Sequence, residues 1–227
     1  MGGRVVRAPA QRVLLGRDRI AFDGRRVAEA EVERIVLAYH KPKGLITSRT
    51  DPGGRPTIYD ALPDLPAWVF PVGRLDKDTA GLLILTNDHR LGHRLTDPES
   101  HVEKRYQVLV KGVPSVEALD VLRAGVDIGD ERPTRLARVR VLGSPRAGGT
   151  WLEIVLTEGR NRQVRRMCAA VGHDVLELVR VGIGGLALDP LEPGHWRRLD
   201  PREVERLLTS PAAATSPHPR DSSGSSR

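Results

Sequence analysis

The chain has 227 residues, carries a formal net charge of +7, and contains few aromatic residues (4%). Its length allows one large domain or two small ones, and its basic charge favours a polyanionic partner. Cys168 is the only cysteine, which excludes an internal disulfide and a cysteine metal cluster. No apolar run approaches membrane-spanning length, so we expect a cytoplasmic protein with no membrane partner.

The first 34 residues are expected to form a basic arm that ends in a small hairpin. Residues 1–12 are basic and aperiodic, and Asp23-Gly24 marks a two-residue turn within 17–29. A short apolar strand is predicted from Ile35 to Tyr39, followed by Lys41-Pro42-Lys43-Gly44.

Residues 73–81 form a charged segment with a glycine at each end, between the apolar runs 68–72 and 82–85. Both runs have the length of buried strands, and polar loops held by such strands commonly carry chemistry. Arg74 and Asp76 are two residues apart, so an extended backbone would place both side chains on the same side. A neighbouring guanidinium favours the ionised carboxylate. The segment indicates either a reactive aspartate with a cationic partner or an ordinary solvated turn.

Three later segments alternate in the manner of antiparallel strands with one solvated face. Their inward residues are Tyr106, Val108 and Val110; Ala137, Val139 and Val141; and Leu152, Ile154 and Leu156. A helix is predicted between Ser115, a candidate N-cap, and Gly125. The expected fold is α/β (α+β), with a mixed, mainly antiparallel sheet.

A second helix, rich in arginine, is predicted to open within residues 159–167 and to end at Gly172. Its apolar face consists of Val164, Met167, Cys168 and Val171. Helical geometry places Arg162 and Arg166 on the opposite face, towards solvent or phosphate, and Arg165 at the border, where it can turn into a cleft. Cys168 is expected to be a core residue rather than a reactive thiol.

The ordered set of motifs resembles the RsuA/RluB/RluE/RluF group of bacterial pseudouridine synthases. The motifs that carry this resemblance are KPKG at 41–44, DPGGRPT at 51–57, PVGRLD at 71–76, GLLILTND at 81–88, VEKRY at 102–106, EGRNRQVRRM at 158–167 and GHWR at 194–197. The resemblance implies a catalytic domain over 35–208, in which two subdomains flank a central active cleft. Residues 209–227, rich in Ser, Pro and Ala, are expected to form a disordered tail.

The resemblance also implies an isomerase that converts selected uridines of ribosomal RNA to pseudouridine without a cofactor or metal. The expected substrate is 23S rRNA ahead of 16S rRNA, and the expected state is a monomer. Asp76 aligns with the catalytic aspartate, Tyr106 with the tyrosine that stacks on the target base, and Arg165 with the basic residue that pairs with the carboxylate. The uridine must be flipped out of its stack. Asp76 would act as a nucleophile or as the base that begins a glycal route, and both remain open.

Further basic residues are candidates for contacts with RNA phosphates. They are Arg74, Lys41, Lys43, Arg160, Arg162 and Arg166. For Lys41 and Lys43 a solvated strand end is an equal alternative. Asp78 and Asp88 are expected to be structural, because hard metals need more oxygen ligands than this loop offers.

Many relatives of this group carry a complete N-terminal S4 RNA-binding domain, whereas only 40 residues precede the Lys41 motif here. Residues 17–29 look like the last hairpin of such a domain, so docking is expected to rely on the catalytic surface, the arginine helix or ribosomal partners. Two other functions were weighed. A non-catalytic rRNA-binding assembly factor has no need of Asp76, Tyr106 and Arg165 together. A metal-dependent glycosyl- or phosphotransferase would need a phosphate-cradling glycine loop, which is missing.

Overall fold

The computed structural model describes residues 21–22, 25–26, 33–62, 65–146 and 148–209. The chain divides into two compact units, residues 1–34 and 35–227. In the first unit, strand β1 (Ala21–Phe22) pairs in antiparallel fashion with β2 (Arg25–Arg26) across two residues, which confirms the predicted hairpin. The predictions of a basic arm over 1–12 and of a disordered tail concern residues that, except for Thr209, lie outside the described part.

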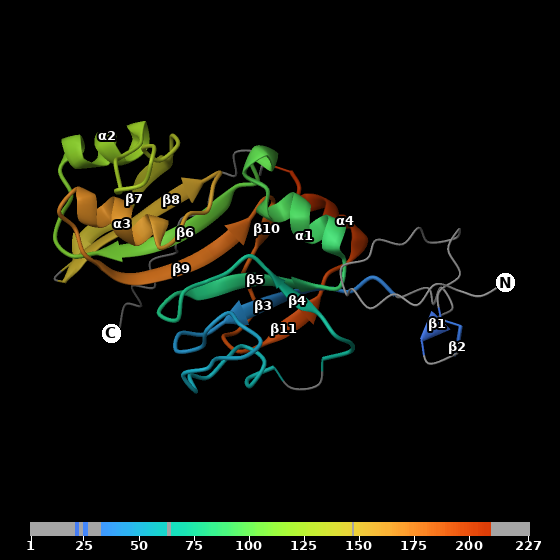
Figure 1. Ribbon diagram of the computed structural model, residues 1–227. Helices are drawn as coiled ribbons and strands as arrows, with labels where there is room; N and C mark the ends of the chain where they lie inside the picture. The colour runs from blue at the N-terminus through green and yellow to red at the C-terminus, as the bar shows by residue number, and fades with distance from the viewer. Residues whose placement is uncertain (1–20, 23–24, 27–32, 63–64, 147, 210–227) are drawn as a thin grey trace, which may run out of the picture. The chain divides into compact units, whose positions relative to one another are not determined.

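The second unit is built on a mixed sheet, which has nine strands within the described residues (Figure 1). Its strands are β3 (Val36–Lys41), β4 (Phe70–Val72), β5 (Ala80–Thr86), β6 (Lys104–Val110), β7 (Arg138–Arg146), β8 (Gly149–Leu156), β9 (Val175–Ile183), β10 (Leu186–Ala187) and β11 (Trp196–Arg198). The order is β11-β3-β5-β9-β6-β8-β7, with β4 beside β5 and β10 beside β9. Of these pairs only β5–β9 is parallel, so the predicted mixed, mainly antiparallel sheet is confirmed.

The short parallel pair joins the two halves of the sheet, β11-β3-β5 with β4 on one side and β9-β6-β8-β7 on the other. Ala80 lies opposite Val179, and Gly81 lies opposite Arg180. Gly81 has a φ of +114°, and a Cβ at this position would lie 2.3 Å from the carbonyl oxygen of Arg180. Only glycine therefore allows the two strands to approach this closely.

Helices cover both halves of the sheet (Figure 1). They are α1 (His89–Thr96), the 3₁₀ turn η1 (Pro98–Ser100), α2 (Val116–Ala124), α3 (Gln163–Ala170) and α4 (Pro201–Arg206). The two predicted helices correspond to α2, which Ser115 caps and Gly125 ends, and to α3. Helix α1 was not predicted from the sequence. Asp88 caps this helix by accepting from the amides of Arg90 and Leu91, which is a structural role as expected.

Three apolar clusters form the core, one of them between α2, α3 and strands β6 to β9. Tyr106 packs against this cluster, and Met167 and Cys168 are fully buried in it. Burial raises the pKa of the Cys168 thiol to about 12, so Cys168 is a core residue, as predicted. Among the described residues, no helix is both long and apolar enough to cross a membrane.

Candidate active-site cleft

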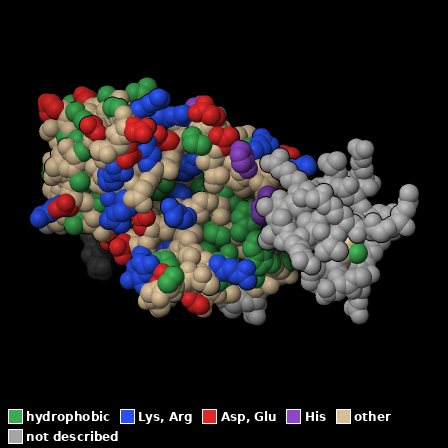
Figure 2. Space-filling model, in the orientation of Figure 1, with side chains coloured by type: hydrophobic (Ala, Val, Ile, Leu, Met, Phe, Trp, Pro, Cys, Tyr) green, Lys and Arg blue, Asp and Glu red, His purple; other side chains and the backbone are tan. Residues whose placement is uncertain are grey.

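A cleft with a volume of about 260 Å³ lies where the two halves of the sheet meet. Its walls come from the β4–β5 loop, the end of α1, the start of β6, the β8–α3 loop and β9. Figure 2 shows lysine and arginine side chains gathered around a hollow on this face. The volume is just below the range of about 300–1,000 Å³ typical of pockets for drug-sized ligands.

Lys41 lies fully buried beneath the loop that carries Asp76. Its Nζ donates hydrogen bonds to the carbonyl oxygens of Pro42 (3.0 Å), Asp76 (3.1 Å) and Thr79 (2.9 Å). Burial lowers the pKa of Lys41 to about 8, although the charges of Asp76 and Asp78 act in the opposite direction. An ammonium with no exposed surface and three carbonyl partners cannot contact an RNA phosphate, so the predicted phosphate role of Lys41 is wrong.

Three further donors hold the same loop. The donor and acceptor pairs are Thr47 Oγ1 with Leu75 O (2.8 Å), Gly44 N with Lys77 O (2.8 Å) and Arg165 Nη2 with Asp78 O (3.0 Å). Together with Lys41, these donors occupy all five consecutive carbonyl oxygens of residues 75–79. The loop is therefore fixed through its main chain.

The side chain of Asp76 lines the cleft and is 32% exposed. Its Oδ2 lies 3.7 Å from Nη1 of Arg162, whereas Arg165 donates to the carbonyl oxygens of Asp78 and Val175. Arg165 does turn towards the loop, but the predicted ion pair between Arg165 and Asp76 is contradicted. Arg162 is exposed, as expected, but its assignment to a face of the helix was wrong. This residue precedes the helix as its N-cap with a left-handed φ of 48°, so helical spacing does not determine its direction.

Tyr106 lies on β6 between two neighbouring strands, opposite Ile154 of β8 and Arg180 of β9. Its side chain is half-buried and lines the cleft together with Asp76. A register irregularity falls between Arg105 and Tyr106 on the β9 side. The cleft thus brings Asp76 and Tyr106 together from segments 30 positions apart in the sequence.

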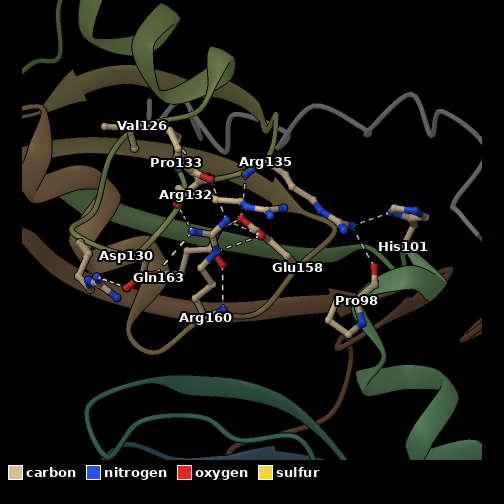
Figure 3. Close-up of polar contacts among 12 residues, drawn as sticks. Pro98, His101, Val126, Asp130, Arg132, Pro133, Arg135, Glu158, Arg160 and Gln163 are labelled. Atoms are coloured by element: carbon tan, nitrogen blue, oxygen red, sulfur yellow. Dashed lines mark hydrogen bonds and ion pairs between the residues drawn. The ribbon is translucent and has the colours of Figure 1, made fainter.

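Arg160 does not present a free guanidinium to the cleft (Figure 3). It donates to the carbonyl oxygens of Arg132 (2.6 Å) and Pro133 (2.8 Å), and to Oε2 of Glu158 (3.1 Å). Glu158 is buried and also accepts from Nε2 of Gln163 (2.6 Å). The group fixes the β8–α3 loop against residues 132–133, so Arg160 is structural rather than the predicted phosphate contact.

Arg166 has a similar structural role. Its Nη2 donates to Oδ1 of Asp130 (2.6 Å) and to the carbonyl oxygen of Ile128, and its Nη1 donates to the carbonyl oxygen of Asn161. These contacts tie α3 to the segment before β7, and they contradict the prediction that Arg166 meets phosphate.

Arg74 and Lys43 remain accessible. Arg74 is exposed and lines the cleft, and it has no hydrogen-bond or ion-pair partner among the described residues. Lys43 is exposed, and its Nζ lies 3.6 Å from Oε2 of Glu177. The two side chains of this ion pair are each 47% exposed. Such a pair contributes little stability and is readily exchanged for a phosphate.

The sequence analysis missed two basic residues in the cleft, Lys104 and Arg180. Lys104 could have been found, because it precedes Tyr106 by two positions and therefore shares its face of the strand. Arg180 gave no such signal, since an arginine in an apolar strand is normally expected on the solvated face. It is instead only 6% exposed and donates from Nε to the carbonyl oxygen of Leu82 (2.8 Å).

Comparison with known proteins defines the class to which this fold and cleft belong. The RNA pseudouridylate synthase family matches residues 35–170, a segment that includes Asp76, Tyr106 and the arginine helix. The chain belongs to this family, and it is therefore an enzyme of the isomerase class.

The individual relatives are consistent with this assignment. The chain is 38% identical to ribosomal large subunit pseudouridine synthase B of Bacillus subtilis (strain 168), over 91% of this chain and 84% of the relative. It is 46% identical to ribosomal large subunit pseudouridine synthase E of Xanthomonas axonopodis pv. citri (strain 306), over 70% of this chain and 90% of the relative. A crystal structure of a pseudouridylate synthase matches with a TM-score of 0.71 at 33% identity, over 90% of this chain and 86% of that one.

Proposed function

We propose that this enzyme converts one or more uridines of ribosomal RNA to pseudouridine, and that its substrate is the 23S rRNA of the large subunit. Relatives named as large-subunit enzymes, which match most of the chain at 38% and 46% identity, support this substrate. The observation that carries the proposal is Asp76, a carboxylate on a main-chain-fixed loop in a basic cleft that Tyr106 also lines. In this proposal the enzyme acts as a cytoplasmic monomer through residues 35–208 and uses no cofactor.

Asp76 begins the reaction at the ribose. Its carboxylate either attacks C1′ as the C1′–N1 bond breaks, or removes the C2′ proton to give a glycal. The fixed main chain from 75 to 79 holds the carboxylate in place before substrate arrives, which lowers the entropic cost of reaching a reactive geometry. The guanidinium of Arg162, 3.7 Å away, balances the charge of Asp76 in the free enzyme.

Tyr106 supplies the flat side chain against which the flipped uracil stacks. A base inside an RNA helix cannot reach a carboxylate in a cleft, so the nucleotide must leave its stack. Its phosphates then lie at the cleft rim, where Arg74 and Arg162 are exposed and bind them, and Lys43 is a further phosphate contact. Arg165 acts as a positioning residue, through the carbonyl of Asp78.

Asp76→Asn tests the proposal directly. The amide has the same shape but is neither a nucleophile nor a base, so tritium release from rRNA labelled at uridine C5 should fall by at least about a thousandfold. RNA affinity should stay within about threefold of the wild type, because the loop is held by carbonyl oxygens and not by the carboxylate.

A wild-type enzyme that binds rRNA without releasing tritium would favour the assembly-factor alternative, and turnover by Asp76→Asn would remove Asp76 from the chemistry. Mapping pseudouridines in 16S and 23S rRNA from a strain that lacks the protein identifies the substrate. A missing site in 16S rRNA would contradict the proposed subunit.

A further inference from the structure

Two cationic side chains, Lys104 and Arg180, line the cleft, and neither forms an ion pair with a described residue. Lys104 starts β6 two residues before Tyr106, and Arg180 lies opposite Tyr106 on β9. Burial, and to a smaller extent the charge of Arg180, lowers the pKa of Lys104 to about 8.

Both groups have unused hydrogen-bond donors. Nη2 of Arg180 is buried without a partner in a side chain that is only 6% exposed. The ammonium of Lys104, in turn, has neither a hydrogen bond nor an ion pair with any residue in the described part of the chain. A buried donor without a partner is costly unless a bound water or a ligand satisfies it. The ligand expected here is an anionic or strongly polarised oxygen.

The depth of Arg180 indicates which part of the nucleotide supplies that oxygen. Arg180 is buried beside the apolar residues Ile84 and Ile183, which line the same cleft. A hydrated phosphate is better accommodated at the rim, where Arg74 and Arg162 are exposed. The group that enters furthest and stacks on Tyr106 is the uracil ring, whose two carbonyl groups are its oxygen acceptors.

We propose that Lys104 and Arg180 bind a carbonyl oxygen of the target uracil and stabilise the negative charge that this ring gains during the reaction. When the C1′–N1 bond breaks, its electron pair passes to the uracil, which becomes an anion delocalised over its nitrogens and oxygens. The uracil then uses this electron pair to form the C5–C1′ bond. Afterwards C5 loses a proton and N1 gains one. No oxidant or further reactant is needed. The inference rests on the proposed function and assigns two residues to its charge-stabilising step.

Lys104→Met in the full chain tests this assignment. Removing one donor that acts on a developing oxyanion typically costs about 10²–10³ in rate. We therefore expect single-turnover tritium release at saturating enzyme to fall about 100-fold, with the Kd for the same rRNA transcript within about threefold of the wild type. Lys104→Arg keeps the charge and should remain within about tenfold of the wild-type rate. Lys111→Met is the matched control, because this exposed lysine follows the other end of β6.

Each outcome has a distinct meaning. If the wild type releases no tritium, the proposed function fails. If the wild type is active and Lys104→Met retains its rate, the proposed charge stabilisation fails. A variant that binds RNA more weakly but reacts normally at saturation would make Lys104 a phosphate contact and would overturn the proposal. Equal losses in Lys104→Arg and Lys104→Met would also overturn it, because charge would then not be the property that matters. Lys104→Gln, with thermal unfolding measured, should reproduce the Met result in a folded protein.

Discussion

Lys41 ends β3 beneath the Asp76 loop, Lys104 starts β6 on the cleft wall, and burial lowers the pKa of each to about 8. Their surroundings differ. Lys41 donates to three carbonyl oxygens and holds the Asp76 loop, whereas Lys104 has no partner among the described residues and is repelled by Arg180. The first lysine therefore stabilises the fold, and the second is retained at a cost to stability, as is common for groups that act on substrate.

This contrast predicts that Lys104→Met stabilises the protein although it removes activity. The variant no longer carries a half-buried charge beside Arg180, so its free energy of unfolding at pH 7 should rise by about 1–3 kcal/mol. Urea denaturation measures the change. Lys41→Met is the opposing control. It removes the Lys41 donor from three carbonyl oxygens, of which only that of Asp76 keeps another donor among the described residues, the Thr79 amide, and it should lower the free energy of unfolding by about 3 kcal/mol or more. A loss of stability in Lys104→Met would contradict the assigned charge repulsion.

The same charge predicts a pH dependence. Between pH 8 and 10.5 the folded protein carries a neutral Lys104, while the unfolded chain still binds the proton. The unfolded state then binds more protons, so the stability of the wild type rises with pH across this window. The difference in free energy of unfolding between Lys104→Met and the wild type should therefore become smaller as the pH rises from 8 to 10.5. Urea titrations at several pH values test this, and a constant gap would show that Lys104 has an ordinary pKa.

At the level of secondary-structure elements, the cleft depends on a single short parallel contact between β5 and β9. Gly81 and Arg180 face each other there, and Arg180 also reaches the carbonyl oxygen of Leu82. This contact joins the two halves of the sheet, one of which carries the Asp76 loop and the other Tyr106. Its geometry therefore sets how far apart the two side chains lie.

Gly81→Ala should separate these strands. The added Cβ would lie 2.3 Å from a main-chain oxygen, in a backbone conformation that alanine rarely adopts. We expect a loss of about 3 kcal/mol or more in the free energy of unfolding, together with a large loss of activity. Gly148→Ala is the matched control. Gly148 has a similar φ of +111° with nothing within 4 Å, so this variant should lose only about 1–2 kcal/mol. If Gly81→Ala and Gly148→Ala lowered the free energy of unfolding equally, backbone strain alone would explain the effect.

The elements that could be predicted from the sequence are those in which apolar residues lie on the buried face. Alternation indicated β6, β7 and β8, and capping residues marked both ends of α2. Strand β9 was missed because its buried positions include Arg180 and Gly182, which break the apolar alternation. The positions of Asp76 and Tyr106 were found through motifs. The hydrogen-bond partners of Arg160 and Arg166 could not be predicted, because these partners lie 27 to 38 positions away in the sequence.

For the whole molecule, the 36 lysine and arginine residues overstate the number of cations available to RNA. Many arginines form ion pairs within the described structure, among them Arg123, Arg135, Arg138, Arg140, Arg160, Arg166 and Arg197. Arginine content therefore does not identify the RNA-binding surface. The exposed residues of the cleft rim, Arg74 and Arg162, are better candidates.

The salt dependence of RNA binding distinguishes these two groups of arginines. Each phosphate contact contributes about 0.7–0.9 to the slope of log K against log salt concentration. Arg74→Ala should therefore reduce the magnitude of the slope by roughly 0.7–0.9, whereas Arg166→Ala should leave it unchanged. Filter binding of one rRNA transcript between 50 and 200 mM salt measures both, in the range where such contacts are resolved. If Arg166→Ala reduced the slope and Arg74→Ala did not, the RNA backbone would bind over α3 instead of at the cleft rim.

The loop that carries Asp76 is held by five main-chain carbonyl oxygens, a group that every amino acid supplies. Lys77 and Asp78 expose their side chains at the tip of this loop, and neither side chain is needed to hold it. These two positions are therefore free to diverge during evolution while the carboxylate stays in place. Preference for a different RNA surrounding the target uridine can arise there by ordinary substitution, with the reaction geometry inherited intact.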